Sequence, residues 1–238
     1  MAERFENLLK TLFQALIVSC QPVPGGPFDA PDLVVRFVKA AELGGASAVR
    51  VEGIKNVEAV CQATTLPVIG LVKRKMPGAD VYITPSLEDV EDLAAHGARI
   101  IAFDATSRDR LIPVGEMIAR IHALNCSAMA DVATTREGVA ASRQGAEFVG
   151  TTLSGYTADS PQQLEPDLEL VSSLAQAGVR VIAEGRIATP SQAAQALRNG
   201  AFAVTVGTAI TRPEWTTCSF TRALSESNSL ARQEEETR

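Results

Sequence analysis

Short apolar segments rich in β-branched residues recur eight times along the chain, and a longer segment with helical periodicity follows each of them. Such alternation is typical of a parallel sheet built from β–α units. The expected strands are residues 14–20, 47–53, 67–73, 98–106, 127–133, 147–155, 179–186 and 201–209. The expected helices include residues 32–45, 56–65, 86–97, 114–125, 135–145, 167–178, 191–200 and 219–227. Eight such units predict a single-domain α/β protein with the (β/α)8 TIM barrel architecture, which typically takes about 250 residues.

A doubly wound open sheet is the structural alternative to the barrel. It rarely needs eight consecutive units, and it usually has a glycine-rich first turn, which is absent after residues 14–20. We therefore expect a barrel that forms the catalytic domain over residues 1–224. Residues 225–238 are polar and charged, and we interpret them as a C-terminal tail that is frayed helix or disorder. Ser86 and Asp89 have the spacing of a helix-start cap.

Composition excludes several classes of partner. The formal net charge of −6 argues against a nucleic-acid surface, because phosphate neutralisation needs clustered Lys and Arg. No apolar stretch approaches the roughly 20 residues of a membrane-spanning helix, and charged residues interrupt the N-terminal segment where a secretory signal would be apolar. The four cysteines form no C-x-x-C pair and are expected to be reduced thiols. We expect a cytoplasmic protein with no membrane or nucleic-acid partner.

Charged side chains end several of the expected strands, and three of them are candidates for acid–base chemistry. In a barrel of this type the active site lies at the carboxyl-terminal ends of the strands, and inward side chains of alternate strands share a layer. Lys73, Asp131 and Glu184 end strands three, five and seven, so they could face one another. Burial would lower the pKa of the lysine, whereas nearby carboxylates would raise it. The alternative is a structural ion-pair network that closes the barrel.

Glycines and arginines follow the last two expected strands. Gly185 and Gly207 let the backbone approach a ligand closely, and a short helix that begins at Thr208 would point free N–H groups at an anion. Arg186 and Arg212 could add positive charge. Many barrels bind phosphate at this position, so the sequence predicts a phosphorylated substrate.

The segment TTLSGY, residues 151–156, follows the sixth expected strand. It lacks the G-x-S-x-G frame of a hydrolase nucleophile. We interpret it as a loop that lines the substrate site, with Thr152 and Tyr156 as candidate contacts. Tyr156 could donate a hydrogen bond or simply cover the mouth of the barrel.

Histidines are too few and too far from the strand ends to predict a transition-metal site. The only two, His96 and His122, fall in expected helices, whereas catalytic zinc and iron sites usually recruit imidazoles. A magnesium site made of carboxylates is an alternative that nothing in the sequence requires. We therefore expect no metal.

Nine sequence blocks together resemble one enzyme family. In order they are IVSCQPVP, AVRVEGI, VIGLVKR, YITP, MADVAT, GTTLSGYT, VIAEGR, TP and VTVGTAITRP. From Ala15 to Pro213 the chain closely resembles the bacterial N-acetylmannosamine-6-phosphate 2-epimerases of sialic acid catabolism. The resemblance implies a barrel enzyme that interconverts N-acetylmannosamine 6-phosphate and N-acetylglucosamine 6-phosphate without a metal or organic cofactor.

The resemblance also implies roles for individual residues. The catalytic lysine of the family corresponds to Lys73, its strand-seven glutamate to Glu184 and its strand-five aspartate to Asp131. Gln21, Arg50 and Arg212 match residues that contact the substrate. The chain departs from the family in the loop KRKMPGAD, residues 73–80, and in the charged tail.

The expected chemistry is removal and return of the C2 proton. Ring opening exposes an aldehyde that acidifies C2, Lys73 acts as general base and then as acid, and Arg50 stabilises the enolate oxygen. The second face of C2 could be served by Lys73 itself or by Glu184, and we favour Lys73. The alternative hypotheses for the function are a Schiff-base aldolase, a metal-dependent pentose-phosphate epimerase and a non-catalytic sugar-phosphate sensor. Because proteins with this fold commonly form dimers, we expect a homodimer.

Overall fold

The strands close into a barrel, as the sequence predicts. The computed structural model describes residues 2–236, with side chains over residues 3–227. Its strands are β1 (Leu16–Cys20), β2 (Ala48–Glu52), β3 (Val68–Leu71), β4 (Ile100–Asp104), β5 (Ser127–Asp131), β6 (Phe148–Gly150), β7 (Val181–Ala183) and β8 (Ala203–Val206). Each strand pairs in parallel with the next in the sequence, and β8 pairs with β1. This closed parallel sheet confirms the (β/α)8 architecture and excludes the open-sheet alternative.

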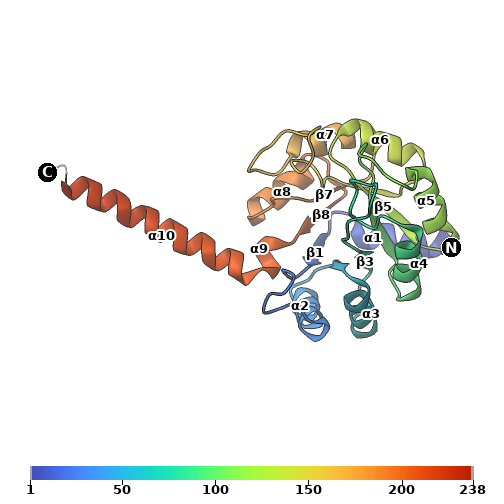
Figure 1. The fold of residues 1–238 in the computed structure, drawn as a ribbon, viewed down its shortest axis with the longest axis horizontal. Coiled ribbons are helices and arrows are strands. Elements are labelled where there is room, and N and C mark those ends of the chain that lie inside the picture. The colour runs from blue at the N-terminus through green and yellow to red at the C-terminus, as the bar shows by residue number, and fades with distance from the viewer. Residues whose placement is uncertain (1, 237–238) are drawn as a thin grey trace.

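Helices surround the barrel and connect its strands (Figure 1). They are α2 (Pro31–Leu43), α3 (Ile54–Ala63), α4 (Leu87–Ala95), α5 (Val114–Ala123), α6 (Thr135–Arg143), α7 (Leu168–Gln176) and α8 (Pro190–Arg198). The expected cap at Ser86 is confirmed, because its side chain accepts from the Asp89 amide and Asp89 bonds back to Ser86. Thr134 begins α6 and Thr189 begins α8 with the same reciprocal cap, in which each helix start satisfies its own free amides.

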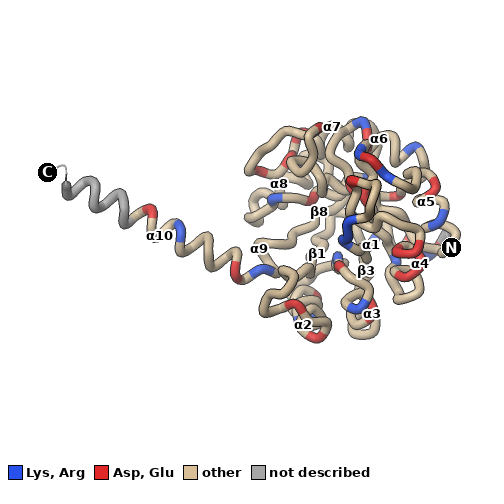
Figure 2. The backbone as a smooth tube through the Cα atoms, in the orientation of Figure 1, with Lys and Arg blue, Asp and Glu red and all other residues tan. Residues whose placement is uncertain are grey.

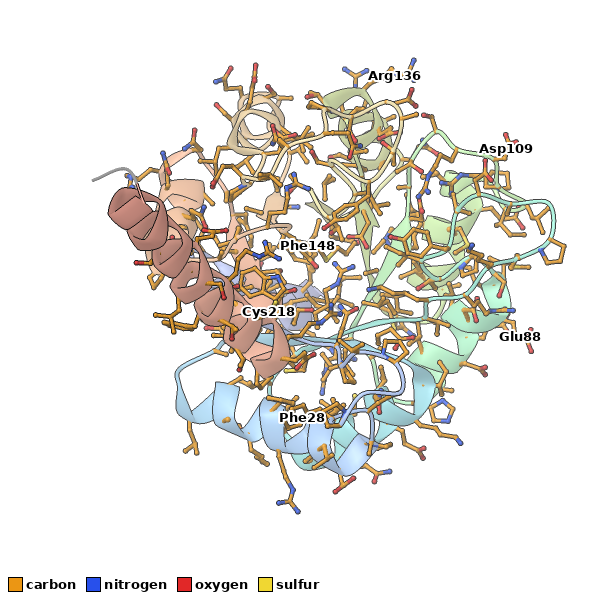
Figure 3. The ribbon with its side chains drawn as sticks, turned by 60° about the vertical axis from the view of Figure 1, so that its left-hand side comes forward. Phe28, Glu88, Asp109, Arg136, Phe148 and Cys218 are labelled. Atoms are coloured by element: carbon orange, nitrogen blue, oxygen red, sulfur yellow. The ribbon has the colours of Figure 1, made fainter. Side chains whose placement is uncertain are left out.

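The core has two layers. Inward side chains such as Phe148, which has no exposed surface, fill the barrel, while the outward faces of the strands pack against the helices. Figure 3 shows Phe148 inside the ring of helices. The sequence analysis missed α1 (Ala2–Leu12), an amphipathic helix that precedes β1. Leu12 of α1 is fully buried with the barrel interior and Leu8 packs against it, so α1 covers the end of the barrel remote from the strand carboxyl ends.

The chain ends in a short helix, α9 (Thr208–Thr211), and a long one, α10 (Pro213–Glu236). Figure 1 shows α10 extending away from the barrel, Figure 3 places Cys218 on it, and Figure 2 shows charges of both signs along it. The expected boundary between a barrel and a tail at residue 224 therefore lies inside one continuous helix. Among the described residues, none of the helices combines the length and the apolar character that crossing a lipid bilayer requires.

Candidate active site

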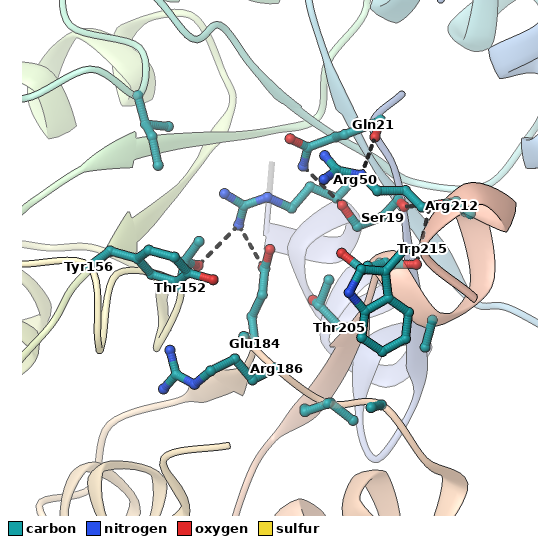
Figure 4. Close-up of a pocket in the computed structure, with 18 of the residues that line it drawn as sticks. Ser19, Gln21, Arg50, Thr152, Tyr156, Glu184, Arg186, Thr205, Arg212 and Trp215 are labelled. Atoms are coloured by element: carbon teal, nitrogen blue, oxygen red, sulfur yellow. Dashed lines mark hydrogen bonds and ion pairs between the residues drawn. The ribbon is translucent and has the colours of Figure 1, made fainter. Parts of the chain in front are cut away.

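A cavity of about 430 Å³ opens at the carboxyl-terminal ends of the strands (Figure 4). Residues from the ends of six strands and the loops that follow them contribute to its wall. The predicted site residues that line it are Gln21, Arg50, Lys73, Thr152, Tyr156, Glu184, Gly185, Arg186, Gly207, Thr208 and Arg212. Asp131 is fully buried beneath the cavity and reaches it only through other side chains. The fold thus brings together every residue that the sequence singled out for chemistry.

Arg50 lies at the centre of the charged groups, with no exposed surface. Its Nη2 donates to Asp131 Oδ2 at 2.6 Å, and its Nη1 donates to Asp131 Oδ1 at 3.1 Å and to Glu184 Oε2 at 2.8 Å. Thr152 Oγ1 donates to Asp131 Oδ1 at 2.7 Å and so holds the carboxylate from its other side. A single guanidinium therefore joins β2 to the ends of β5 and β7. Asp131 and Glu184 contact this arginine, whereas the sequence analysis expected them to face Lys73.

Burial and the neighbouring charges shift the pKa of Arg50 and of Glu184. Burial opposes the charge of Arg50, but the carboxylates of Asp131 and Glu184 outweigh it and raise the pKa of the guanidinium. Burial, together with the negative charge of Asp131, raises the pKa of Glu184 against the opposing effect of Arg50. Arg50 is therefore a fixed cation and Glu184 is a carboxyl group that takes a proton more readily than usual. Among the described residues, no three His, Cys, Asp or Glu side chains are grouped as metal ligands.

Lys73 follows the end of β3 by two residues, and its side chain enters the same cavity. Its Nζ donates to Gln21 Oε1 at 2.7 Å, and Gln21 Nε2 donates to Ser19 Oγ at 2.9 Å. The amide of Lys73 donates to Glu52 Oε1 at 3.3 Å. Gln21 accepts from Lys73 through a neutral oxygen, so this contact orients the amine without adding a negative charge beside it.

The surroundings of Lys73 lower its pKa and so give it more neutral amine than an ordinary lysine has. The residue is exposed to the open cavity, but the cavity walls limit hydration of the amine, and burial is the main cause that lowers its pKa. The positive charge of Arg50 lowers it further, while Glu184 and Glu52 act in the opposite direction. A lysine with a lowered pKa supplies a larger fraction of free amine near neutral pH, which is what a general base requires.

Arg186 holds the loop between β6 and α7 against the cavity. Its Nη1 donates to the carbonyl oxygen of Ser154 at 2.6 Å, its Nε donates to the carbonyl oxygen of Glu165 at 2.9 Å, and its guanidinium lies over the Tyr156 ring. Gly155 makes this possible, because an added Cβ would lie 2.6 Å from Arg186 Nη1. Arg186 therefore shapes the wall that carries Tyr156, a role that the sequence analysis did not foresee.

The opposite wall is formed where β8 passes into α9. Gly207 precedes α9, and an added Cβ would lie 3.1 Å from Ser19 Cβ, so a glycine allows close contact with β1. Thr208 begins α9, and the first amides of a helix have no acceptor within the helix. Arg212 Nε donates to the carbonyl oxygen of Gln21 at 3.2 Å. Free amides and an arginine therefore meet on one side of the cavity.

Among the cavity residues that sequence reasoning missed are Thr205 and Trp215. Thr205 is buried, and its hydroxyl is one of two buried side-chain polar atoms without a partner in the described chain, the other being Arg50 Nε. The available signal was a polar residue at an inward position of an otherwise apolar strand. Asp104, at the end of β4, pairs with Arg108 and does not line the cavity.

Gly150 packs directly against the charged network. An added Cβ would lie 2.7 Å from Asp131 Oδ1 and 2.9 Å from Thr152 Oγ1, and contacts this short force neighbours to move. We expect Gly150→Ala to lower the free energy of unfolding by about 1–3 kcal/mol and to reduce catalytic turnover by about tenfold, because a displacement of catalytic groups is costly. Urea unfolding and turnover of the protein's reaction are the measurements.

The matched control is Gly115→Ala, because Gly115 lies in α5 and an added Cβ would meet only the end of the Gln144 side chain. An alanine there should stabilise the helix by about 0.5–1 kcal/mol and leave turnover unchanged. If Gly150→Ala behaved like this control, the packing at Gly150 would not hold the network in place.

The chain is similar to proteins of one named family. Residues 34–226 match the family described as "Putative N-acetylmannosamine-6-phosphate epimerase". Relatives from Yersinia pestis (strain Pestoides F) and Yersinia pseudotuberculosis serotype O:3 (strain YPIII), each named "Putative N-acetylmannosamine-6-phosphate 2-epimerase", are 51% identical over 208 residues, or 87% of this chain and 89% of theirs. The solved N-acetylmannosamine-6-phosphate 2-epimerase from Clostridium perfringens is 39% identical, with a TM-score of 0.88 over 91% of this chain and 96% of that one. A thiamine phosphate pyrophosphorylase from Pyrococcus furiosus, at 19% identity and a TM-score of 0.60, shares the fold alone.

Proposed function

The chain belongs to the N-acetylmannosamine-6-phosphate epimerase family, and from that premise we propose a reaction and a role for each group in the cavity. The chain is an epimerase that interconverts N-acetylmannosamine 6-phosphate and N-acetylglucosamine 6-phosphate, in the breakdown of sialic acid in the cytoplasm. One observation carries the proposal: the same cavity contains Lys73, whose pKa is lowered, and the buried Arg50, which forms ion pairs with Asp131 and Glu184.

The reaction inverts C2, so it must break and re-form the C2–H bond. That proton is unreactive in the closed sugar, because C1 is then a hemiacetal carbon. Opening of the ring produces an aldehyde at C1 and makes the C2 proton acidic. The free amine of Lys73 takes this proton, the electron pair of the C–H bond moves to the aldehyde oxygen as an enolate, and the ammonium returns a proton to the other face of C2.

Arg50 is the group that would stabilise the enolate. It is a permanent cation, and Nε is a buried donor without a partner among the described residues. Asp131 and Glu184 hold the guanidinium in place before the substrate binds, so little reorganisation is needed when charge develops. Preorganised positive charge of this kind is commonly the largest single contribution to catalysis.

Lys73 is the principal proton carrier in this proposal, acting on both faces after the open-chain substrate rotates. Glu184 is the alternative donor for the second face. The raised pKa of Glu184 supports its ability to hold a proton, but its Oε2 is already an acceptor for Arg50 at 2.8 Å. Gln21 keeps the amine of Lys73 pointed into the cavity.

The phosphate group would lie against the wall formed by Gly207 and Thr208, where Arg212 supplies positive charge, while Gly185 and Arg186 approach it from the loop after β7. The first amides of α9 and the Arg212 side chain border the same part of the cavity. Thr152 and Tyr156 would contact the sugar from the opposite loop. A substrate held at its phosphate end leaves C1 and C2 free to reach Lys73 and Arg50.

Proton NMR of N-acetylmannosamine 6-phosphate with the protein in D2O tests the proposal. The C2 proton signal should disappear while the gluco epimer appears with deuterium at C2. The reaction should stop at an equilibrium mixture and leave no covalent adduct after borohydride treatment. A trapped adduct would indicate Schiff-base chemistry instead, and binding without either exchange or epimerisation would indicate a sugar-phosphate sensor.

We also propose that the chain forms a homodimer through α10. An isolated helix of this kind is marginal in water unless a tertiary contact covers its apolar face. Phe220 and Leu224 lie one turn apart on α10, and 70% and 67% of their surfaces are exposed within one chain. A second copy of the chain would cover these side chains and supply the missing contact.

The double variant Phe220→Glu/Leu224→Glu should shift the protein from twice the chain mass to the chain mass, because two carboxylates would be buried without partners. Light scattering after size-exclusion chromatography measures this. The control is Cys218→Glu/Ser225→Glu, which adds the same charge to α10 at exposed positions away from the face of Phe220 and Leu224. A variant that keeps the oligomeric state of the wild type would rule out α10 as the dimer contact.

A further inference from the structure

Lys73 lies at the start of the segment that connects β3 to α4. Two antiparallel bridges, Lys73 with Ile83 and Met76 with Ala79, make residues 72–84 of this segment a hairpin. The Arg74 amide donates to the carbonyl oxygen of Tyr82 at 3.0 Å. The hairpin includes residues 74–80 of the KRKMPGAD loop and residues 82–84 of the YITP block, and the proposed mechanism gives these residues no role.

Thr84 closes this hairpin in an unusual backbone conformation. Its φ is 46°, in the left-handed region, and 1% of its surface is exposed. A β-branched residue rarely adopts this conformation, because its Cβ substituents collide with the backbone. Glycine would adopt the same conformation freely. A threonine that is held here against its preference therefore indicates that its side chain contributes something a glycine could not.

The contribution of Thr84 is visible in its hydrogen bonds. Its backbone amide donates to the carbonyl oxygen of Val72 at 2.7 Å, and its hydroxyl oxygen accepts from the Val72 amide at 3.2 Å. The hydroxyl donates in turn to the carbonyl oxygen of Ala102 in β4 at 2.6 Å. Thr84 thus satisfies both backbone groups of Val72, the residue before Lys73, and ties them to a neighbouring strand.

The return arm of the hairpin is itself anchored in the barrel. Ile83 is 1% exposed and packs with the barrel interior, and its carbonyl oxygen accepts from the Asp104 amide at 2.9 Å. The ordered pairing of β3 with β4 ends at Gly70 and Ile101. Beyond that point, Ile83 and Thr84 lie between the two strands and replace their direct contact.

We infer that Thr84 is a positioning residue, whose hydroxyl fixes the backbone at Val72 and thereby holds the amine of Lys73 where the C2 proton of the substrate must lie. This inference rests on the proposed function for the identity of the reacting atom. A lysine side chain has four rotatable bonds, so a fixed backbone and the Gln21 contact together define where Nζ can reach. Displacement of a catalytic group by about 1 Å can lower a rate by roughly 100-fold.

Three variants separate positioning from a merely structural role. Thr84→Val keeps the shape but removes the hydroxyl, Thr84→Ser keeps the hydroxyl, and Thr84→Gly removes the hydroxyl together with the backbone strain, so it still folds if the valine variant does not. Thr106→Val is the matched control. Thr106 is also buried, and its hydroxyl donates to Asp104, outside the cavity and without a contact to Val72.

Thr84→Val and Thr84→Gly should lower kcat by about 10- to 100-fold while KM changes by less than about twofold, because phosphate binding lies elsewhere. The acid limb of the pH dependence of kcat/KM should move to higher pH, because a mobile amine is better hydrated and its pKa rises. Thr84→Ser should retain both properties. Thr106→Val should lose stability only.

A second measurement needs no turnover. The pH dependence of acylation of Lys73 by a small reagent, followed by peptide mass spectrometry, reports the pKa of the amine directly. We expect a higher pKa in Thr84→Gly than in Thr84→Ser. An unchanged pKa and kcat in Thr84→Gly, or an equal loss in Thr84→Ser, would overturn the inference. If the wild type failed to exchange the C2 proton, the proposed function would fall, whereas the acylation result would still decide whether Thr84 holds Lys73.

Discussion

Replacement of Lys73 by alanine should reduce epimerisation by about 10³-fold or more, since general acid–base catalysis typically contributes 10²–10⁴-fold and this residue serves both proton transfers in the proposed mechanism. Exchange of the C2 proton with D2O should fall by the same factor, because exchange requires the deprotonation step alone. Binding of the substrate should persist, since the phosphate contacts that we propose lie after β7 and β8 and do not involve Lys73. NMR exchange and equilibrium binding measured on the same sample test both parts.

The role of Lys73 can also be tested through the pH dependence of kcat/KM. The base is active only as free amine, so kcat/KM of the wild type should fall about tenfold per pH unit below the pKa of Lys73. Burial lowers that pKa, so the fall begins at lower pH than for an ordinary lysine. Lys75→Ala is the control, because Lys75 is exposed and lies two residues beyond Lys73. A Lys73→Ala variant that still exchanged the C2 proton at the wild-type rate would transfer the role of base to Glu184.

The order of the strands could be predicted from the sequence because each β–α unit is encoded locally. Segments such as residues 127–133 and 179–186 are apolar, short and bounded by polar helix starts, so periodicity alone identifies them. The amphipathic helix α1 was missed although Phe5, Leu8, Leu9 and Leu12 have helical spacing. The apolar face of α1 packs against the interior at one end of the barrel, and this contact exists only in the folded protein.

The residues of the site could be predicted, but their partners could not. Position at a strand end is a property of the local sequence, and it identified Lys73, Asp131 and Glu184. The contact between Arg50 and both carboxylates depends on side-chain reach across the barrel, from β2 to β5 and β7. The hairpin over residues 72–84 is also a tertiary feature, because its return arm is held by β4 and by the barrel core. Sequence patterns contain no information on such contacts.

The different partners of Arg50 and Lys73 explain why the two residues would have different roles in the reaction. Arg50 is paired with two carboxylates and keeps its charge, whereas Lys73 is paired with a neutral amide and can lose its charge. Acid–base chemistry at C2 needs one group of each kind, because the base must be neutral while the enolate needs a cation. In the proposed mechanism the carboxylates therefore act mainly by holding Arg50.

Arg50→Met should destabilise the fold by about 3–5 kcal/mol, the usual consequence of leaving a buried charge without its partner. Asp131 would lose two hydrogen bonds and Glu184 one, both in a part of the barrel with little access to water. Turnover should fall by about 10²–10³-fold, since removal of one preorganised group that stabilises developing charge has an effect of that size. Urea unfolding and kinetics measure the two effects, and Arg50→Met/Asp131→Asn should recover part of the stability, because the two residues are directly coupled.

The pH dependence of this variant has a definite sign. The pKa of Glu184 in the fold lies above its ordinary value of 4.5, because burial and Asp131 outweigh Arg50. A carboxyl group with a raised pKa in the fold contributes stability at low pH and loses that contribution as pH rises through the raised value. Without Arg50 the pKa of Glu184 rises further, so the stability gap between variant and wild type should be widest near neutral pH and should narrow as pH falls toward 4.5. A gap that stayed constant or widened on acidification would mean that Glu184 does not depend on Arg50 for its charge.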